Sequence, residues 1–241
     1  MVTVFWLSLR QLTGRFRLAI VLFLAALPVG LAALVFGLAA DDASYEEGFI
    51  NLLFDLLIVG AIVPIITMAF STAAFGNDLE DRTLSYLVLK PIPRWRIVLS
   101  KLLASMVVSG PLLIASGVVA TFLGLEADAR TAVAVGVALF AGLSAYTTIF
   151  IWAGLITRWA LPFALIYVFL WELLIGSFIE SVGYLSVRGY TLAIMHGVDE
   201  KTFEELSSRV IEFPAALASA AGVTVLFFWL TVRRLRRMDV P

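Results

Sequence analysis

Residues 75–101, FGNDLEDRTLSYLVLKPIPRWRIVLSK, form a charged segment between two long apolar runs. The segment begins with acidic residues, continues with an amphipathic run and ends with a basic cluster. Pro91 and Pro93 predict that any helix stops between the amphipathic run and the basic cluster. Because so many charges are costly in hydrocarbon, we expect this segment to be solvated and to contact a partner.

The composition around this segment predicts an integral membrane protein. Of the 241 residues, 61% are hydrophobic, and the mean hydropathy is +1.01. A soluble domain of this length could not bury that much apolar surface. The net charge of −1 gives no reason to expect a nucleic-acid partner. The absence of cysteine and the single histidine exclude a disulfide framework and a multi-histidine metal site.

We predict one all-α transmembrane domain, residues 1–241, with six membrane-spanning helices. Each apolar run has about 20 residues, which at about 1.5 Å per residue cross about 30 Å of hydrocarbon. The runs are continuously apolar rather than alternating, which argues against strands. The predicted spans are 18–39, 49–74, 98–123, 132–156, 160–179 and 214–232.

The distribution of basic residues orients these spans. With the N-terminus inside, 13 of the 17 lysine and arginine residues are cytoplasmic. Arg130, Arg188, Lys201 and Arg209 are the four that fall outside. This excess predicts a multi-pass protein of the plasma (inner) membrane with both termini in the cytoplasm.

Two segments outside the spans have helical patterns. Residues 2–17 predict a helix that lies on the inner membrane surface, with Arg10 and Arg15 directed to water and headgroups. Its apolar face would hold Phe5, Trp6, Leu9 and Leu12. The long outer connection, 181–212, contains a capping box, Thr202-x-x-Glu205. It predicts a short amphipathic helix at the outer leaflet or over a cavity, with Phe203, Leu206, Val210 and Phe213 on its apolar face.

The sequence gives no support for an enzyme. It contains no GxxxxGK[ST] phosphate loop, so this chain is not expected to hydrolyse ATP by that route. Ser144 lies within the fourth predicted span whereas His196 lies in the outer connection, so a serine–histidine dyad would be at mismatched depths. We therefore expect no catalytic residues, no metal and no cofactor in this chain.

Two acidic residues lie inside predicted spans. Glu172 is near the middle of the fifth span, where an ionised carboxylate costs about 2.5–3.5 kcal/mol, and we expect no basic residue inside the membrane to offset it. It must therefore be protonated, hydrogen-bonded to another helix or exposed to water. Asp55 is nearer the outer end of the second span and could reach the interface. A substrate path or a helix–helix switch is one interpretation of both residues, and a structural hydrogen bond is the other.

Small residues recur at a spacing of four in the fourth span, as Ala138/Gly142 and Ala141/Ala145. Such pairs let helices approach closely. We interpret them as packing inside the bundle, with a dimer face as the alternative.

The charged segment resembles the cytosolic loop of type-2 ATP-binding cassette (ABC) exporter permeases. The resemblance rests on Glu80-Asp81-Arg82-Thr83-Leu84, then Leu87, then Pro91-Ile92-Pro93-Arg94, then Lys101. That family has Glu, Gly-Thr, Leu-x-x-Leu, Pro-x-Ser-Arg and Gly-Lys in a loop between the second and third of six spans. The chain departs from the pattern at Arg82, Pro93 and Ser100. Glu172 followed by Leu185-Ser186-Val187-Arg188 is also similar to a pattern in part of the family.

The resemblance implies a short coupling helix near residues 79–89 that docks in a groove of a separate cytosolic ABC ATPase. Leu84, Leu87 and Val88 would insert, and Glu80, Arg82 and Arg94 would form charge pairs at the rim, with Thr83 in the same motif. ATP and magnesium would be bound by that ATPase. A second permease copy or homologue and the lipid bilayer would be the other partners. The exported substrate would be small or amphipathic.

Two alternatives stay open on the sequence alone. The chain could be a non-transporting membrane anchor or sensor that uses the charged segment to hold a cytosolic partner. The amphipathic run could also lie flat on the inner leaflet. A copurifying ATPase would favour export, whereas a kinase or scaffold would favour an anchor.

Overall fold

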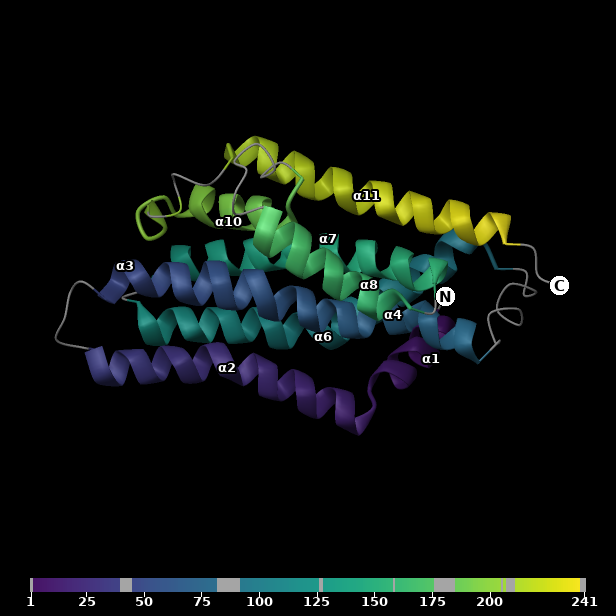
Figure 1. Ribbon diagram of the computed structural model, residues 1–241, viewed down its shortest axis with the longest axis horizontal. Helices are drawn as coiled ribbons and strands as arrows, with labels where there is room; N and C mark the ends of the chain where they lie inside the picture. The colour runs from purple at the N-terminus through teal and green to yellow at the C-terminus, as the bar shows by residue number, and fades with distance from the viewer. Residues whose placement is uncertain are drawn as a thin grey trace.

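The structure, a computed structural model, describes residues 2–39, 45–81, 92–125, 128–157, 159–175, 185–204, 206 and 211–238. Every regular element in these ranges is helical. The helices lie side by side along the long axis, and both ends of the chain lie toward the same end of the bundle, at the right of Figure 1. We call this the terminal end and the opposite end, where α3 begins, the distal end.

The helices follow the apolar runs of the sequence, because only a helix satisfies the backbone within each run. The elements are α1 (Val2–Leu12), α2 (Arg15–Ala39), α3 (Tyr45–Ile50), η1 (Asn51–Ile62), α4 (Val63–Glu80), α6 (Arg94–Gly124), α7 (Ala129–Ile156), α8 (Ala160–Ile166), η2 (Tyr167–Ile175), α10 (Val187–Val198) and α11 (Phe213–Arg237). The elements η1 and η2 are π-helices, and each continues an α-helix without a break.

Five helical segments are long and apolar enough to cross a membrane, which agrees with an all-α integral membrane protein. They are Arg17–Val35, Gly48–Glu80, Arg94–Gly124, Ala129–Ile156 and Phe213–Arg237. A shorter apolar segment, Ala160–Glu172, covers part of the fifth predicted span. Because residues 176–184 lie outside the described part of the chain, the count of six spans stays a prediction.

Helix α7 lies at the centre of the bundle and packs against α4, α6, α10 and α11. Its small residues allow these close contacts. Ala138 and Ala145 are fully buried, and a side chain at Gly142 would overlap Thr191 of α10. The predicted role of these three residues in packing inside the bundle is therefore confirmed.

Gly154 lies at a close approach of α7 to α4, and we expect Gly154→Ala to lower the free energy of unfolding by about 1–3 kcal/mol. A methyl group there would overlap the backbone carbonyl of Thr72, which cannot rotate away. The matched control is Gly136→Ala on the same helix, where the nearest atom to the new carbon is 3.9 Å away on Ile114. Thermal unfolding in detergent measures both variants, and equal melting temperatures would show that α4 and α7 separate without cost.

The outer connection differs from its prediction. Residues 187–198 form α10, which packs against α7 and α11 and was not predicted. In the predicted helix, the described residues form turns and a short 3₁₀ segment, with Phe203 and Leu206 buried in the core. Phe203 packs edge-to-face on Phe54 of η1, with ring centroids 5.4 Å apart. These residues pack inward because the bundle offers them more apolar contact than the surface does. Glu205 and Val210 lie outside the described residues.

Helix α1 also presents a different face from the one predicted. Leu12 is buried, but Trp6 is 62% exposed and so does not share its face. The inward positions are Val4, Ser8 and Leu12, which follow the spacing of four along a helix. Helical spacing left this choice open, because it does not say which side of α1 a neighbouring helix covers.

At the distal end, hydrogen bonds join the start of α7 to the end of α10. Asp128 caps α7 by accepting the backbone N–H of Thr131 at 2.9 Å, and this bond holds the pKa of Asp128 below its usual range. The Thr131 hydroxyl donates to Asp199 at 2.7 Å. Burial alone would raise the pKa of Asp199, but hydrogen bonds from Thr131 and Thr202 lower it. Arg130 Nε donates to the carbonyl of Val198 at 2.8 Å, which further ties α10 to α7.

Candidate functional site

Each of the two acidic residues inside the bundle lies on a π-helix. Asp55 lies on η1 and Glu172 on η2. At the end of η1, the Val63 N–H still bonds to the Ile58 carbonyl, and Pro64, which follows, has no N–H to donate. Because π-helical turns are rare and frequently occur at functional sites, both acids are candidate functional residues.

The Glu172 carboxylate is fully buried and accepts hydrogen bonds from four donors. Its Oε1 accepts from the Tyr167 hydroxyl and the Val187 backbone N–H, both at 3.0 Å. Its Oε2 accepts from the Ser186 hydroxyl at 2.6 Å and from the Arg188 backbone N–H at 3.2 Å. Two of these donors are the first free N–H groups of α10, so the carboxylate occupies the anion-binding position at that helix N-terminus.

Ser186 acts in two ways at the start of α10. It is the N-cap residue, and its Oγ accepts the Gly189 backbone N–H at 3.0 Å while its hydroxyl donates to Glu172. Capping the helix and binding the carboxylate therefore depend on the same side chain. This arrangement fixes the start of α10 against η2.

Arg188 extends the cluster to a third helical element. Its Nε lies 2.6 Å from Oδ1 of Asp55, and its Nη1 donates to the backbone carbonyl of Glu172 at 3.4 Å. Asp55 is itself buried, at 4% exposure. Asp55, Tyr167, Glu172, Ser186 and Arg188 thus form one polar cluster, which joins η1, η2 and α10 and which we call the acidic–arginine cluster.

The acidic–arginine cluster confirms one prediction about the two acids and shows another to be wrong. Glu172 is hydrogen-bonded to another helix, which was one of three predicted states. Asp55 is buried beside Arg188. The expectation that no basic residue offsets the acids was wrong, because α10 brings Arg188 inward from the predicted outer connection. The signal for this was the serine followed by an apolar helical pattern in 186–195.

The second part of the site is the base of the charged segment, where α4 and α6 are joined. Lys101 Nζ lies 2.7 Å from Oδ2 of Asp78, and these side chains are 1% and 2% exposed. The same ammonium group donates to the Ala74 carbonyl and lies 4.8 Å from the ring centroid of Phe75. All three contacts hold Lys101 of α6 against α4, so the two helices are clamped together where the charged segment begins and ends.

The structure places only part of the predicted ATPase-coupling set. Glu80 is the last residue of α4 and is exposed, and Arg94 is the first residue of α6 and is partly buried. Arg82, Thr83, Leu84, Leu87 and Val88 lie outside the described residues. Among the described residues, no group of three or more His, Cys, Asp or Glu side chains could hold a metal ion.

These features define a multi-pass, all-α membrane protein with a buried polar cluster and a clamped helical pair at one end. A family model described as CcmB protein matches residues 57–158. The match covers 102 of the 241 residues, so it shows similarity to that family over this part of the chain. It contains Asp78 and Lys101, whereas Asp55, Glu172 and Arg188 lie outside it. No curated protein matches the chain.

Proposed function

We propose that this protein is the membrane-spanning subunit of an ABC exporter of the type-2 class, driven by ATP hydrolysis in a separate cytosolic subunit. The family match supports the permease role, and its residues include the whole of α4, the charged segment and α6. Two permease chains and two ATPases would form the working assembly in the plasma (inner) membrane. Both chain termini would face the cytoplasm.

The single observation that carries this proposal is the buried pair of Lys101 and Asp78. A docking segment can transmit a movement of the ATPase to the membrane domain only if the two helices that hold the segment move together. The ion pair makes α4 and α6 such a unit, because separating them would leave two uncompensated charges in an apolar environment. ATP-driven closure of the partner would then move both helices as a rigid body.

The acidic–arginine cluster is the element on which this movement acts in our proposal. Helix α4 is continuous with η1, which holds Asp55, and Asp55 contacts Arg188 at the start of α10. A shift of α4 along its axis would therefore pull on Arg188 and on the α10 N-terminus that binds Glu172. This gives both acids a role in a helix switch, with the substrate passing alongside.

The cargo we propose is a small or amphipathic molecule. The matched family is one of permease components of haem exporters, so haem is the first cargo to test. Haem is a planar apolar ring with two carboxylates, and such a molecule crosses a membrane poorly unless its charged groups are shielded.

Leu87→Glu tests the docking of the ATPase. We expect this variant to bind the ATPase roughly 30-fold more weakly, because a buried apolar anchor at an interface contributes about 2 kcal/mol or more. The measurement is recovery of the ATPase with the tagged chain from membranes in mild detergent, together with the ATP turnover of the recovered complex. Leu87→Met is the matched control and should bind normally, since it keeps the apolar character.

Two outcomes would contradict the proposal. Equal recovery of the ATPase with Leu87→Glu would show that this residue is not an anchor. Recovery of a kinase or scaffold in place of an ATPase would instead favour the membrane-anchor alternative.

A further inference from the structure

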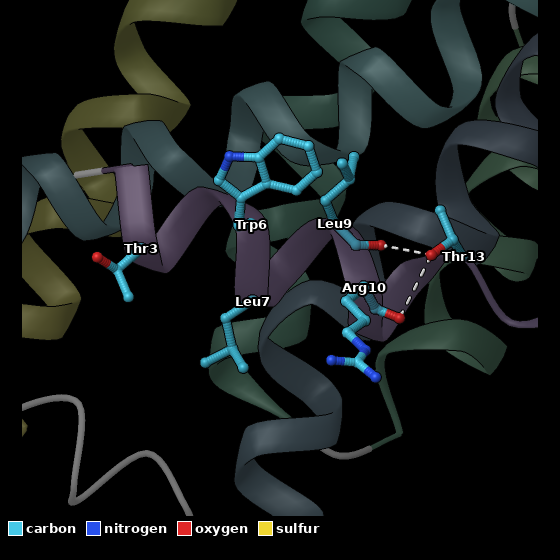
Figure 2. A pocket seen from close by; sticks show the side chains of 6 residues that line it. All are labelled: Thr3, Trp6, Leu7, Leu9, Arg10 and Thr13. Atoms are coloured by element: carbon cyan, nitrogen blue, oxygen red, sulfur yellow. Dashed lines mark hydrogen bonds between the residues drawn. The ribbon is translucent and has the colours of Figure 1, made fainter.

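The outward face of α1 lines a hollow of about 670 Å³, which is open to the surroundings. Figure 2 shows it from close by, with Trp6 on one side of the helix and Leu7 and Arg10 on the other. The Thr13 hydroxyl closes the end of the helix by donating to the Leu9 carbonyl at 3.0 Å. The lining residues are Thr3, Trp6, Leu7, Leu9, Arg10 and Thr13.

The hollow is apolar although it lies on an uncovered surface. The inward face of α1 packs on α6 and α4, whereas Trp6 and Leu7 on the outward face are 62% and 51% exposed. Exposing both an indole and an isobutyl group to water is unfavourable, so this face needs an apolar cover. Tryptophan at the end of a membrane-spanning bundle is typical of the headgroup level of the bilayer.

The position of α1 along the chain agrees with that depth. Helix α1 ends at Leu12, and the first candidate span begins at Arg17. The hollow extends to Thr13, which leaves 14–16 between the hollow and the span. The hollow is therefore at the boundary between headgroups and hydrocarbon, where one ligand can present both a phosphate and acyl chains.

The positive charge of the N-terminal region favours an anionic ligand. Residues 1–40 contain Arg10, Arg15 and Arg17 and no acidic residue. In the part of the chain that the structure describes, ion pairs join Lys101 to Asp78 and Arg188 to Asp55, and none involves Arg10. Arg10 is exposed in the hollow and carries a planar fork of N–H donors, which suits a phosphate.

We propose that the outward face of α1 is a binding site for one anionic phospholipid of the adjacent leaflet. Its phosphate binds the Arg10 guanidinium, and its acyl chains cover Trp6 and Leu7. The lipid completes the apolar contacts of α1 and holds the helix at the membrane surface. This site is separate from the acidic–arginine cluster and does not depend on the proposed transport activity.

Native mass spectrometry of the full chain in mild detergent tests the site, with phosphatidylglycerol and phosphatidylcholine of the same acyl chains as probes. We expect one phosphatidylglycerol per chain, bound about tenfold more tightly than phosphatidylcholine, because the choline cation is repelled by Arg10. Arg10→Gln should remove this preference. The matched control is Arg233→Gln, since Arg233 is an arginine outside the hollow whose guanidinium lies 5.0 Å from the Trp229 ring centroid.

Further measurements distinguish a lipid site from a free-phosphate site, from unspecific attraction and from a protein interface. Glycerol 3-phosphate should not displace the lipid, because it lacks the acyl chains; displacement would point to a site for free phosphate and overturn the proposal. Loss of preference in Arg233→Gln as well would show unspecific attraction to basic residues. A cytosolic protein that binds α1 and displaces phosphatidylglycerol would show that the face is a protein interface. Arg10→Gln should melt at the wild-type temperature, since its side chain is exposed.

Discussion

Replacing Glu172 by alanine should lower the free energy of unfolding by about 3 kcal/mol and abolish transport. The change removes the acceptor of four donors, two of which are backbone N–H groups at the buried start of α10. Each buried donor left without a partner costs about 1–3 kcal/mol. The total loss of stability is smaller than the sum over four donors, because the unfolded chain within the membrane also finds hydrogen-bond partners. Thermal unfolding in detergent and uptake into vesicles measure the two effects.

A variant that removes only one of the four donors distinguishes a role of Glu172 in a helix switch from a purely structural hydrogen bond. Tyr167→Phe removes one donor and leaves three, so we expect a loss of about 1 kcal/mol and a folded protein. If the cluster changes during transport, Tyr167→Phe should alter the transport rate more than its small loss of stability explains. Glu200→Ala is the control, because Glu200 is exposed and its replacement should change stability by less than about 0.5 kcal/mol. Wild-type stability of Glu172→Ala would show that the four donors do not need the carboxylate.

The acids of this cluster could be predicted from the sequence, but their partner could not. Glu172 and Asp55 stood out because charges in apolar helices are costly and therefore rare. Arg188 looked like one of four outer basic residues, because hydropathy does not show that α10 packs inside the bundle. The contact joins residues 133 positions apart in the chain, and helical periodicity carries no information at that separation.

At the base of the charged segment, the sequence likewise did not predict which charged residue is buried. Lys101 was expected to be solvated with the rest of the charged segment, because charges are costly in hydrocarbon. It is instead buried against α4, since Asp78 and the Ala74 carbonyl satisfy its ammonium group there. The spans were predictable because each is a local property of about 20 residues. Which of their charged ends face inward depends on how the helices pack.

Lys101→Met should lower the free energy of unfolding by about 3–5 kcal/mol, because it leaves the Asp78 carboxylate buried without a cation. The double variant Lys101→Met/Asp78→Leu should recover stability to within about 1 kcal/mol of wild type. An apolar pair of similar volume replaces a buried ion pair with little or no loss, since neither side chain then has to be taken out of water as a charge. Chemical or thermal unfolding of the two single variants and the double variant gives the coupling energy between the residues.

Transport by the double variant decides between a clamp and a switch. If the pair only holds α4 and α6 together, apolar packing serves the same purpose, and ATP-driven transport should return along with stability. If the ion pair opens and closes during each cycle, the double variant should be stable but inactive, because leucine and methionine have no second, solvated arrangement. We expect recovery of both properties, because Lys101 is held by Asp78, by Ala74 and by the face of Phe75 at once, and a group with three simultaneous contacts is suited to a fixed joint. A stable, inactive double variant would contradict the rigid-body coupling on which the proposed function depends.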